Sequence, residues 1–257
     1  MQLDPSAAAA GFRLFAHDIL GSTNSEALAQ SRQGDEGRLW VVAREQSAGR
    51  GRRGREWISA PGNLYATLLL ADPAPADAAP QLAFVTGLAV HDAIVACADE
   101  LAKELALKWP NDLLYANKKL AGILIESEMS ARKLAVAVGV GINCLHHPAQ
   151  ASFPATDLAE AGKSVSPESL LSALSRTMMG RLAQWNRGAG FAAIRADWLA
   201  HATGLGREMT VRLPGHELNG YFEGLDDSGQ LLLRLADGKL QTITAGDVFP
   251  PAVTGAP

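Results

Sequence analysis

Apolar and polar residues follow two different patterns along the chain, and the pattern changes near residue 204. Before that point, short apolar runs that fit strands alternate with longer stretches whose apolar residues recur at helical spacing. After it come four short apolar runs separated by Pro-Gly, Asp-Asp-Ser-Gly and Asp-Gly turns, which are typical of hairpins. The pattern predicts an α+β domain over residues 1–204 and a small all-β domain over residues 205–257.

The predicted elements of the first part are mixed in type. Strands are expected at 12–15, 39–43, 64–70, 105–108, 120–126 and 134–140. A capping box of Thr23 and Glu26 predicts a helix start, and further helices are expected at 81 to about 106, 167–185 and 191–199. The Pro- and Ala-rich segment 71–80 is a predicted loop. In the second part the predicted strands are 209–213, 218–225, 231–235 and 240–244.

Composition excludes several classes of protein. The 257 residues are 47% hydrophobic and 19% charged, as in an ordinary globular protein, and the formal net charge of −4 gives no basic field for nucleic acid. No unbroken apolar run approaches the roughly 18 residues of a membrane span, and residues 1–10 lack the features of a signal peptide. A cytoplasmic protein is expected.

The two cysteines, Cys97 and Cys144, lie in apolar runs. His146 and His147 follow Cys144 closely, which is a thin signal for a metal site. Buried, reduced thiols are the favoured interpretation.

The most unusual segment is residues 49–55, Gly-Arg-Gly-Arg-Arg-Gly-Arg. Glycines allow the backbone to approach a ligand closely, and guanidinium groups bind phosphate or carboxylate with two parallel hydrogen bonds. The combination suits a loop that closes over an anionic ligand. Taken alone, a solvated turn is an equally good interpretation.

Other interpretations of this loop are weaker. Gly49-x-Gly51-x-x-Gly54 matches a dinucleotide-binding fingerprint, but that motif opens a helix, and here Pro61-Gly62-Asn63 and a strand follow. A phosphate-binding Walker loop would need Lys-Ser/Thr after the last glycine. An Arg/Gly-rich nucleic-acid arm would be longer and would flank the domain.

Three more polar clusters follow in order. Residues 108–112 are Lys-Trp-Pro-Asn-Asp. Their aspartate is a natural Mg²⁺ ligand beside nucleotide phosphates, or else the whole segment is an ordinary turn. Residues 118–126 begin with two lysines and continue as an apolar strand. Either one lysine enters that strand, or both lysines are exposed to solvent. Residues 139–143, Gly-Val-Gly-Ile-Asn, end in an amide that contacts a ligand or only turns the chain.

Together with Ser-Thr-Asn at 22–24, these segments in this order resemble the biotin protein ligase family over roughly residues 12–248. The Arg/Gly loop and Lys-Trp-Pro-Asn-Asp are its most distinctive motifs. The resemblance implies a mixed sheet backed by helices, the class II synthetase-like catalytic domain, with a small C-terminal SH3-like β-barrel. It also implies ATP-dependent transfer of biotin to a lysine through biotinyl-5′-AMP.

The resemblance assigns roles to individual residues. The polar ring around the biotin ureido group is Ser22, Thr23 and Gln46, helped by backbone near Gly49 and Arg50. The groups implied in catalysis are Lys119, Arg52, Arg55 and Asp112, the last as the Mg²⁺ ligand with Asn111 beside it. The remaining implied binding residues are Asn24, Gly51, Trp57, Lys108, Gly122 and Asn143. No aromatic matches the adenine-stacking position clearly, and Phe153 is a weak candidate.

The implied cofactors and substrates are ATP, biotin and Mg²⁺, and the implied partner is a biotin carboxyl carrier protein. About eleven residues precede the first predicted strand, so a DNA-binding domain and DNA binding are not expected. A homodimer and a monomer both stay open. The alternatives are a lipoate or octanoate ligase of related fold, and a non-enzymatic nucleic-acid-binding protein that uses the arginine loop.

Overall fold

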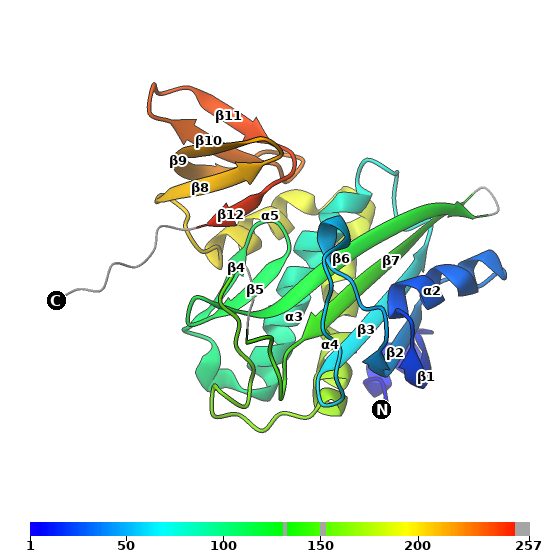
Figure 1. The fold of residues 1–257 in the computed structure, drawn as a ribbon. Helices are drawn as coiled ribbons and strands as arrows, with labels where there is room; N and C mark the ends of the chain where they lie inside the picture. The colour runs from blue at the N-terminus through cyan, green and yellow to red at the C-terminus, as the bar shows by residue number, and fades with distance from the viewer. Residues whose placement is uncertain (131–132, 150–152, 250–257) are drawn as a thin grey trace.

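The protein is described by a computed structural model that covers residues 1–130, 133–149 and 153–249. A seven-stranded sheet with helices forms the first part, and a five-stranded sheet lies at one end of it (Figure 1). The predicted fold class, an α+β part followed by a small all-β part, is confirmed. The last helix of the first part ends at Ala200 and the first strand of the second begins at Glu208, so the predicted boundary after residue 204 falls between them and stays a prediction.

The larger sheet is mixed, as predicted. Its strand order is β1 (Arg13–Leu20), β2 (Leu39–Gln46), β3 (Leu64–Ala71), β7 (Lys133–Ile142), β6 (Lys118–Ser130), β5 (Asp112–Tyr115) and β4 (Leu105–Lys108). Only β1 and β2 pair in parallel, and every other neighbouring pair is antiparallel. The central strands β3 and β7 are apolar on both faces because helices cover both.

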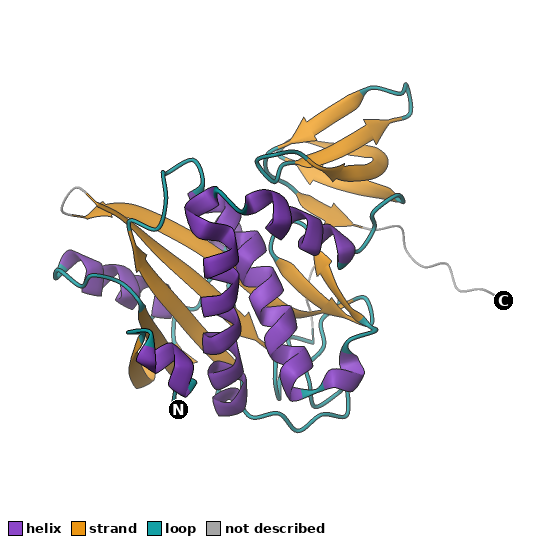
Figure 2. Cartoon of the chain, turned by 180° about the vertical axis from the view of Figure 1, so that it is seen from behind, coloured by secondary structure: helices purple, strands orange, loops and turns teal. Residues whose placement is uncertain are grey.

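Helices cover the two faces unequally. One face carries α2 (Thr23–Arg32), which packs on β2, β3 and β7. The other carries α3 (Leu82–Cys97), α4 (Pro167–Trp185) and α5 (Phe191–Ala200), seen in front of the sheet in Figure 2. The short N-terminal α1 (Pro5–Ala9), which the sequence pattern did not predict, packs against α4. The open part of the α2 face is therefore left for a site.

The central helix α3 is shorter than predicted. It ends at Cys97, because Ala98 (φ −156°, ψ 74°) leaves the helical region and a 3-10 turn follows at Asp99–Leu101. The prediction of a helix to about residue 106 was wrong: Leu101 and Leu105 have helical spacing, but Leu105 begins β4. The stretch Ala79–Cys97 is long and apolar enough to cross a membrane by length and composition, yet 61% of it is buried inside the protein. Its hydropathy therefore reflects packing between the sheet and α4.

Three local predictions need correction. Ser22, not Thr23, is the N-cap of α2 and accepts from the Ser25 amide, so the helix starts one residue from the expected capping box. Residues 112–115 form β5 although the polar cluster before them reads as a turn. The three-residue strand β12 (Asp247–Phe249) is too short to carry a pattern and was also not predicted.

The second part is an antiparallel sheet ordered β11 (Leu240–Ile243), β10 (Leu231–Leu235), β9 (His216–Leu225), β8 (Glu208–Leu213) and β12. Its inward residues, among them Val211, Phe222 and Leu233, are buried. The indole of Trp109 donates to the Gly229 carbonyl at 3.0 Å and so ties this sheet to the loop between β4 and β5. β12 lies beside the loop at residues 49–55, since Arg53 and Arg55 both donate to Asp247.

Candidate active site

A cavity of about 390 Å³ lies between the larger sheet, the loop at residues 49–57 and the edge strand β12. Its size is that of a small-ligand site. Fifteen of the sixteen residues that the sequence proposed for the site line it: Ser22, Thr23, Asn24, Gln46, Arg50, Gly51, Arg52, Arg55, Trp57, Lys108, Asn111, Asp112, Lys119, Gly122 and Asn143. The exception, Gly49, lies behind the wall, where an added Cβ would meet Ser59 and the Trp57 carbonyl at about 2.5 Å.

The inner end of the cavity is a ring of neutral polar groups. The side-chain oxygen of Gln46 accepts from the backbone N–H of Thr23 at 2.9 Å and from the Thr23 hydroxyl at 3.1 Å. The side-chain nitrogen of Gln46 donates to the Ser59 hydroxyl at 2.9 Å. Ser22 and Thr23 begin α2, and Gln46 ends β2, so the ring joins the start of a helix to the end of a strand. Such fixed neutral groups suit an uncharged polar ligand part.

A second chain of contacts starts at Asn24. Its side-chain oxygen accepts from Thr67 at 2.6 Å and its amide donates to Glu126 at 2.8 Å. Glu126 in turn accepts two hydrogen bonds from the Arg50 guanidinium, at 3.2 and 3.1 Å. Arg50 is therefore held by a carboxylate of β6 that the sequence analysis did not single out.

The floor of the cavity is flat because two strands carry glycine there. A Cβ on Gly141 would lie 2.6 Å from the Trp57 ring, and one on Gly122 would lie 2.9 Å from it. These glycines face each other across β6 and β7. The indole of Trp57 therefore rests directly on the backbone of both strands, and any side chain there would displace it.

The charged centre of the cavity is a carboxylate between two ammonium groups. Asp112 lies 2.6 Å from Nζ of Lys119 and 2.9 Å from Nζ of Lys108. Its Oδ1 makes the ion pair with Lys119 without a hydrogen bond of good geometry. Burial alone would raise the pKa of Asp112, but the charges of Lys119 and Lys108 outweigh it and hold the pKa below its usual value. Asp112 is thus ionised and leaves one net positive charge in this cluster.

The arginine loop, residues 49–55, closes one side of the cavity. Arg52 donates to the Asn111 side chain at 3.1 Å and to the Gly246 carbonyl at 3.4 Å. Burial lowers the pKa of Arg52, although the guanidinium still stays charged at neutral pH. The loop forms a 3-10 turn and opens no α-helix, as expected in rejecting the dinucleotide fingerprint.

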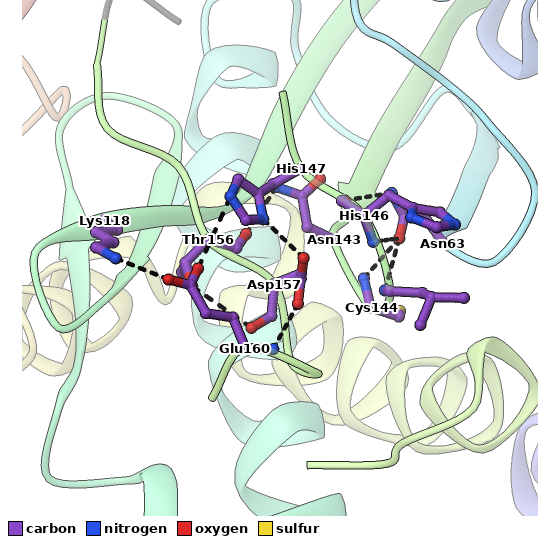
Figure 3. Close-up of polar contacts among 10 residues, drawn as sticks. Asn63, Lys118, Asn143, Cys144, His146, His147, Thr156, Asp157 and Glu160 are labelled. Carbon is purple, nitrogen blue, oxygen red and sulfur yellow. Dashed lines mark hydrogen bonds and ion pairs between the residues drawn. The ribbon is translucent and has the colours of Figure 1, made fainter. Parts of the chain in front are cut away.

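The remaining wall is the segment around residues 153–160, shown in Figure 3. Asn143 donates its side-chain amide to the Thr156 carbonyl at 3.0 Å, and His147 contacts Asp157 at 2.7 Å. Thr156 donates to Glu160 at 2.7 Å. The Asn143 side chain therefore ties this segment to the end of β7, in addition to lining the cavity, and backbone hydrogen bonds with Lys119 hold the segment against β6.

The segment also brings in Phe153. The ammonium of Lys108 lies 4.4 Å from its ring centre, and the ring of Phe249 lies 6.5 Å away. Both aromatics line the cavity. Phe249 belongs to β12, which the sequence did not predict, and so escaped sequence analysis.

Neither cysteine provides chemistry in this cavity. Burial raises the pKa of the Cys144 thiol to about 12, so that it stays neutral. His147 contacts Asp157 rather than a thiol, and the described ranges contain no group of three or more His, Cys, Asp or Glu that could hold a metal ion.

Comparison with known proteins matches this arrangement. The sequence model described as the Biotin/lipoate A/B protein ligase family matches residues 19–143, and that of the Biotin protein ligase C terminal domain matches residues 204–249. A biotin--[acetyl-CoA-carboxylase] ligase of Paracoccus denitrificans is 46% identical over 236 residues, covering 89% of this chain and 96% of the relative. The chain belongs to the biotin protein ligase family.

Two further relatives support this assignment. A biotin--[acetyl-CoA-carboxylase] ligase of Mycobacterium tuberculosis is 35% identical, covering 89% of this chain and 85% of the relative. The biotin protein ligase of Aquifex aeolicus, solved in complex with biotin and ATP, superposes with a TM-score of 0.75 at 28% identity and covers 92% of this chain and 97% of its own. The biotin ligase interpretation is therefore favoured over the lipoate and nucleic-acid alternatives.

Proposed function

We propose that this protein attaches biotin to a lysine of a biotin carboxyl carrier protein at the expense of ATP. In the first step a biotin carboxylate oxygen attacks the α-phosphorus of ATP, which forms biotinyl-5′-AMP and releases pyrophosphate. In the second step the amine of the acceptor lysine attacks the activated carbonyl, and AMP leaves with the pair of electrons of the broken C–O bond. The single observation that carries the proposal is the cavity in which a neutral polar ring and a cationic cluster face one small volume.

The neutral ring and the flat floor fit biotin. Thr23, Gln46 and Ser22 offer the donors and acceptors that a ureido group needs, and the Trp57 indole, packed on Gly122 and Gly141, offers a wall for the apolar part of the ligand. Neutral partners suffice because the ureido group carries no charge. In this proposal the biotin carboxylate points toward Lys119.

The cationic cluster fits the reacting phosphate. Two anions must be brought into contact in the first step, and fixed cations reduce their repulsion and stabilise the charge that develops at phosphorus. Lys119 and Arg52 supply these cations, with Lys108 behind them, and Arg55 lines the same cavity while it is paired with Asp247. Asp112 orients both lysines by its ion pairs.

Mg²⁺ enters this proposal with ATP. Magnesium takes carboxylate and phosphate oxygens and keeps several waters. Both oxygens of Asp112 already face lysine ammonium groups, so this arrangement does not fit a resident metal ion, and no step here depends on one. Ligation of Mg²⁺ by Asp112 after a lysine moves aside stays a prediction, which the Mg²⁺ dependence of ATP binding by Asp112→Asn tests.

The adenylate end lies toward Asn143 and Phe153. Phe153 offers a ring for stacking, and Asn143 holds the segment that carries it. We place the reaction in the cytoplasm, where both thiols stay reduced. A monomer and a homodimer are both compatible with a site that one chain forms.

The test is a mass measurement. The purified protein is incubated with biotin, Mg²⁺, ATP and a biotin carboxyl carrier domain, and the expected result is a biotin-sized mass gain on the carrier that requires ATP. Biotin-dependent pyrophosphate release without that mass gain would support the adenylation step and show that the carrier domain is not the acceptor. A gain with lipoate or octanoate but not biotin, or salt-sensitive nucleic-acid binding without turnover, would replace the proposal by the corresponding alternative.

A further inference from the structure

The arginine loop is fastened to the C-terminal sheet by one carboxylate. Arg53 donates to Asp247 at 3.2 Å, and Arg55 donates to the same carboxylate oxygen. The Asp247 side chain is only 15% exposed. It begins β12, whose pairing with β8 fixes its backbone at Arg212. A carboxylate on an edge strand of the C-terminal sheet is therefore paired with a loop of the other part of the protein.

The backbone conformation of the loop is unfavourable and requires stabilising contacts. Arg53 has φ 58° and ψ 29°, and Gly54 has φ 70°, so two successive residues lie in the left-handed region. A side chain makes that region unfavourable by about 1 kcal/mol, and such conformations persist only where surrounding contacts hold them. The described contacts of the Arg53 side chain are with Asp247.

Arg50 of the loop is paired with Glu126, and Asp247 separates the other three arginines into two groups. Arg53 and Arg55 are paired with it, whereas Arg52 bonds only to neutral oxygens of Asn111 and Gly246 among the described residues. The positive charge of Arg52 is therefore left for a ligand in the cavity. The position of Arg52 depends on the turn that its two neighbours hold.

We propose that Asp247 is a positioning residue that holds the arginine loop shut over the cavity. It acts through Arg53 and Arg55 and touches no reacting atom. Its effect on loop closure depends only on these contacts, whereas its effect on retention of biotinyl-5′-AMP rests on the proposed function.

Limited trypsin digestion of the full-length protein without ligands tests directly whether Asp247 holds the arginine loop closed, because trypsin cleaves after arginine. Asp247→Asn keeps the shape of the side chain and removes its charge, and cleavage within residues 50–55 should become about three- to tenfold faster, the range expected when one partly buried ion-pair cluster is lost. Asp247→Glu should restore most of the protection. Asp237→Asn is the matched control, since Asp237 caps the turn after β10 by accepting from the Lys239 amide. Thermal unfolding of each variant separates local opening from loss of fold.

Retention of the adenylate is the second measurement. Biotinyl-5′-AMP formed in the enzyme should escape several-fold faster from Asp247→Asn, with the escape rate of Asp237→Asn unchanged. Cleavage and escape rates of Asp247→Asn equal to those of the wild type would overturn the proposal. Faster cleavage of Asp247→Asn, with no adenylate formed by any variant or by the wild type, would instead overturn the proposed function. It would still support the role of Asp247 in holding the loop closed.

Discussion

At the scale of single residues, Asp112 pairs with only one of two adjacent lysines, and that lysine lines the cavity. Lys119 and Lys118 are neighbours, yet Lys119 faces Asp112 in the cavity while Lys118 pairs with the exposed Glu160. Lys119→Ala should lower the rate of biotin-dependent ATP–pyrophosphate exchange by about a hundredfold or more, because it removes a preorganised cation from the reacting phosphate. Lys118→Ala removes the same charge from solvent and should leave the rate within about twofold. Full exchange by Lys119→Ala would remove this lysine from the reaction.

A second prediction at this scale concerns the floor. Gly141→Ala would place a Cβ 2.6 Å from the Trp57 ring, which must then move off the strands. Biotin affinity measured by calorimetry should fall by about tenfold or more, as expected when a packed wall is displaced. Gly180→Ala is the control, because nothing lies within 4 Å of its added Cβ on α4. Unchanged affinity in Gly141→Ala would mean that the Trp57 indole does not cover biotin.

The sequence located the residues of the cavity that form compact polar motifs, and it missed those that do not. Arg50 and Lys119 stand in motifs whose glycines and charges are adjacent in the chain. Glu126, by contrast, is one acid that follows the apolar run of β6, and its partner Arg50 is 76 residues away. Asp247 holds residues more than 190 positions distant. Such pairings depend on strand order, which local patterns do not specify.

At the scale of elements, one buried amide fixes the turn that leaves β7. The Asn63 oxygen accepts from the amides of Cys144, Leu145 and His146 at 2.8, 2.9 and 3.2 Å, and its nitrogen donates to the His146 carbonyl (Figure 3). Asn63 is 4% exposed, its hydrogen bond with Cys144 is buried, and those with Leu145 and His146 are part-buried. The chain after Ile142 therefore takes its direction from a residue of the loop before β3.

Asn63→Ala should consequently destabilise the fold. It leaves three N–H groups without an acceptor, the buried one of Cys144 and the part-buried ones of Leu145 and His146, and the free energy of unfolding in urea should fall by about 2–4 kcal/mol. Asn219→Ala, on exposed β9, removes an amide that bonds the exposed Thr210 and should cost under about 0.5 kcal/mol. A loss in Asn63→Ala as small as in this control would show that water replaces the amide.

Elements were predictable where one pattern filled them. β3 and β7 are almost entirely apolar, apart from Thr67 and Lys133, and were placed within two residues of their observed ends. β5 was missed because only three apolar residues follow Asp112, and β12 because three residues carry no period. α3 was extended too far because apolar spacing of four residues continues across a change from helix to strand.

At the scale of the whole molecule, the two parts share one continuous core, in which Phe84 of α3 touches both Phe191 and the Gly229 turn of the C-terminal sheet. The change of pattern near residue 204 predicted the second part but not how it packs, because contacts such as that of Trp109 with Gly229 join residues 120 positions apart. This packing has a functional consequence, since it holds β12 at the cavity. Global stability and the shape of the site are therefore coupled.

Buried acids that stay neutral should make that stability sensitive to alkali. Burial raises the pKa of the Cys144 thiol from 9.0 to about 12. Between pH 9 and 12 the unfolded chain releases this proton while the fold retains it, so the free energy of unfolding falls as pH rises through that window and is unaffected below it. From pH 8.5 to 10.5 the contribution of Cys144 should be a loss of about 1–2 kcal/mol.

Urea unfolding of the wild type and Cys144→Ala at these two pH values measures that contribution as a difference of slopes, which cancels the constant cost of the substitution. The variant should lose less stability than the wild type over the interval. Cys97→Ala is the comparison, because Cys97 is half-buried and its pKa is raised less. Equal losses in the wild type and Cys144→Ala would mean that the fold opens around residue 144 before it unfolds, and the Asn63 turn would then have to be the part that opens.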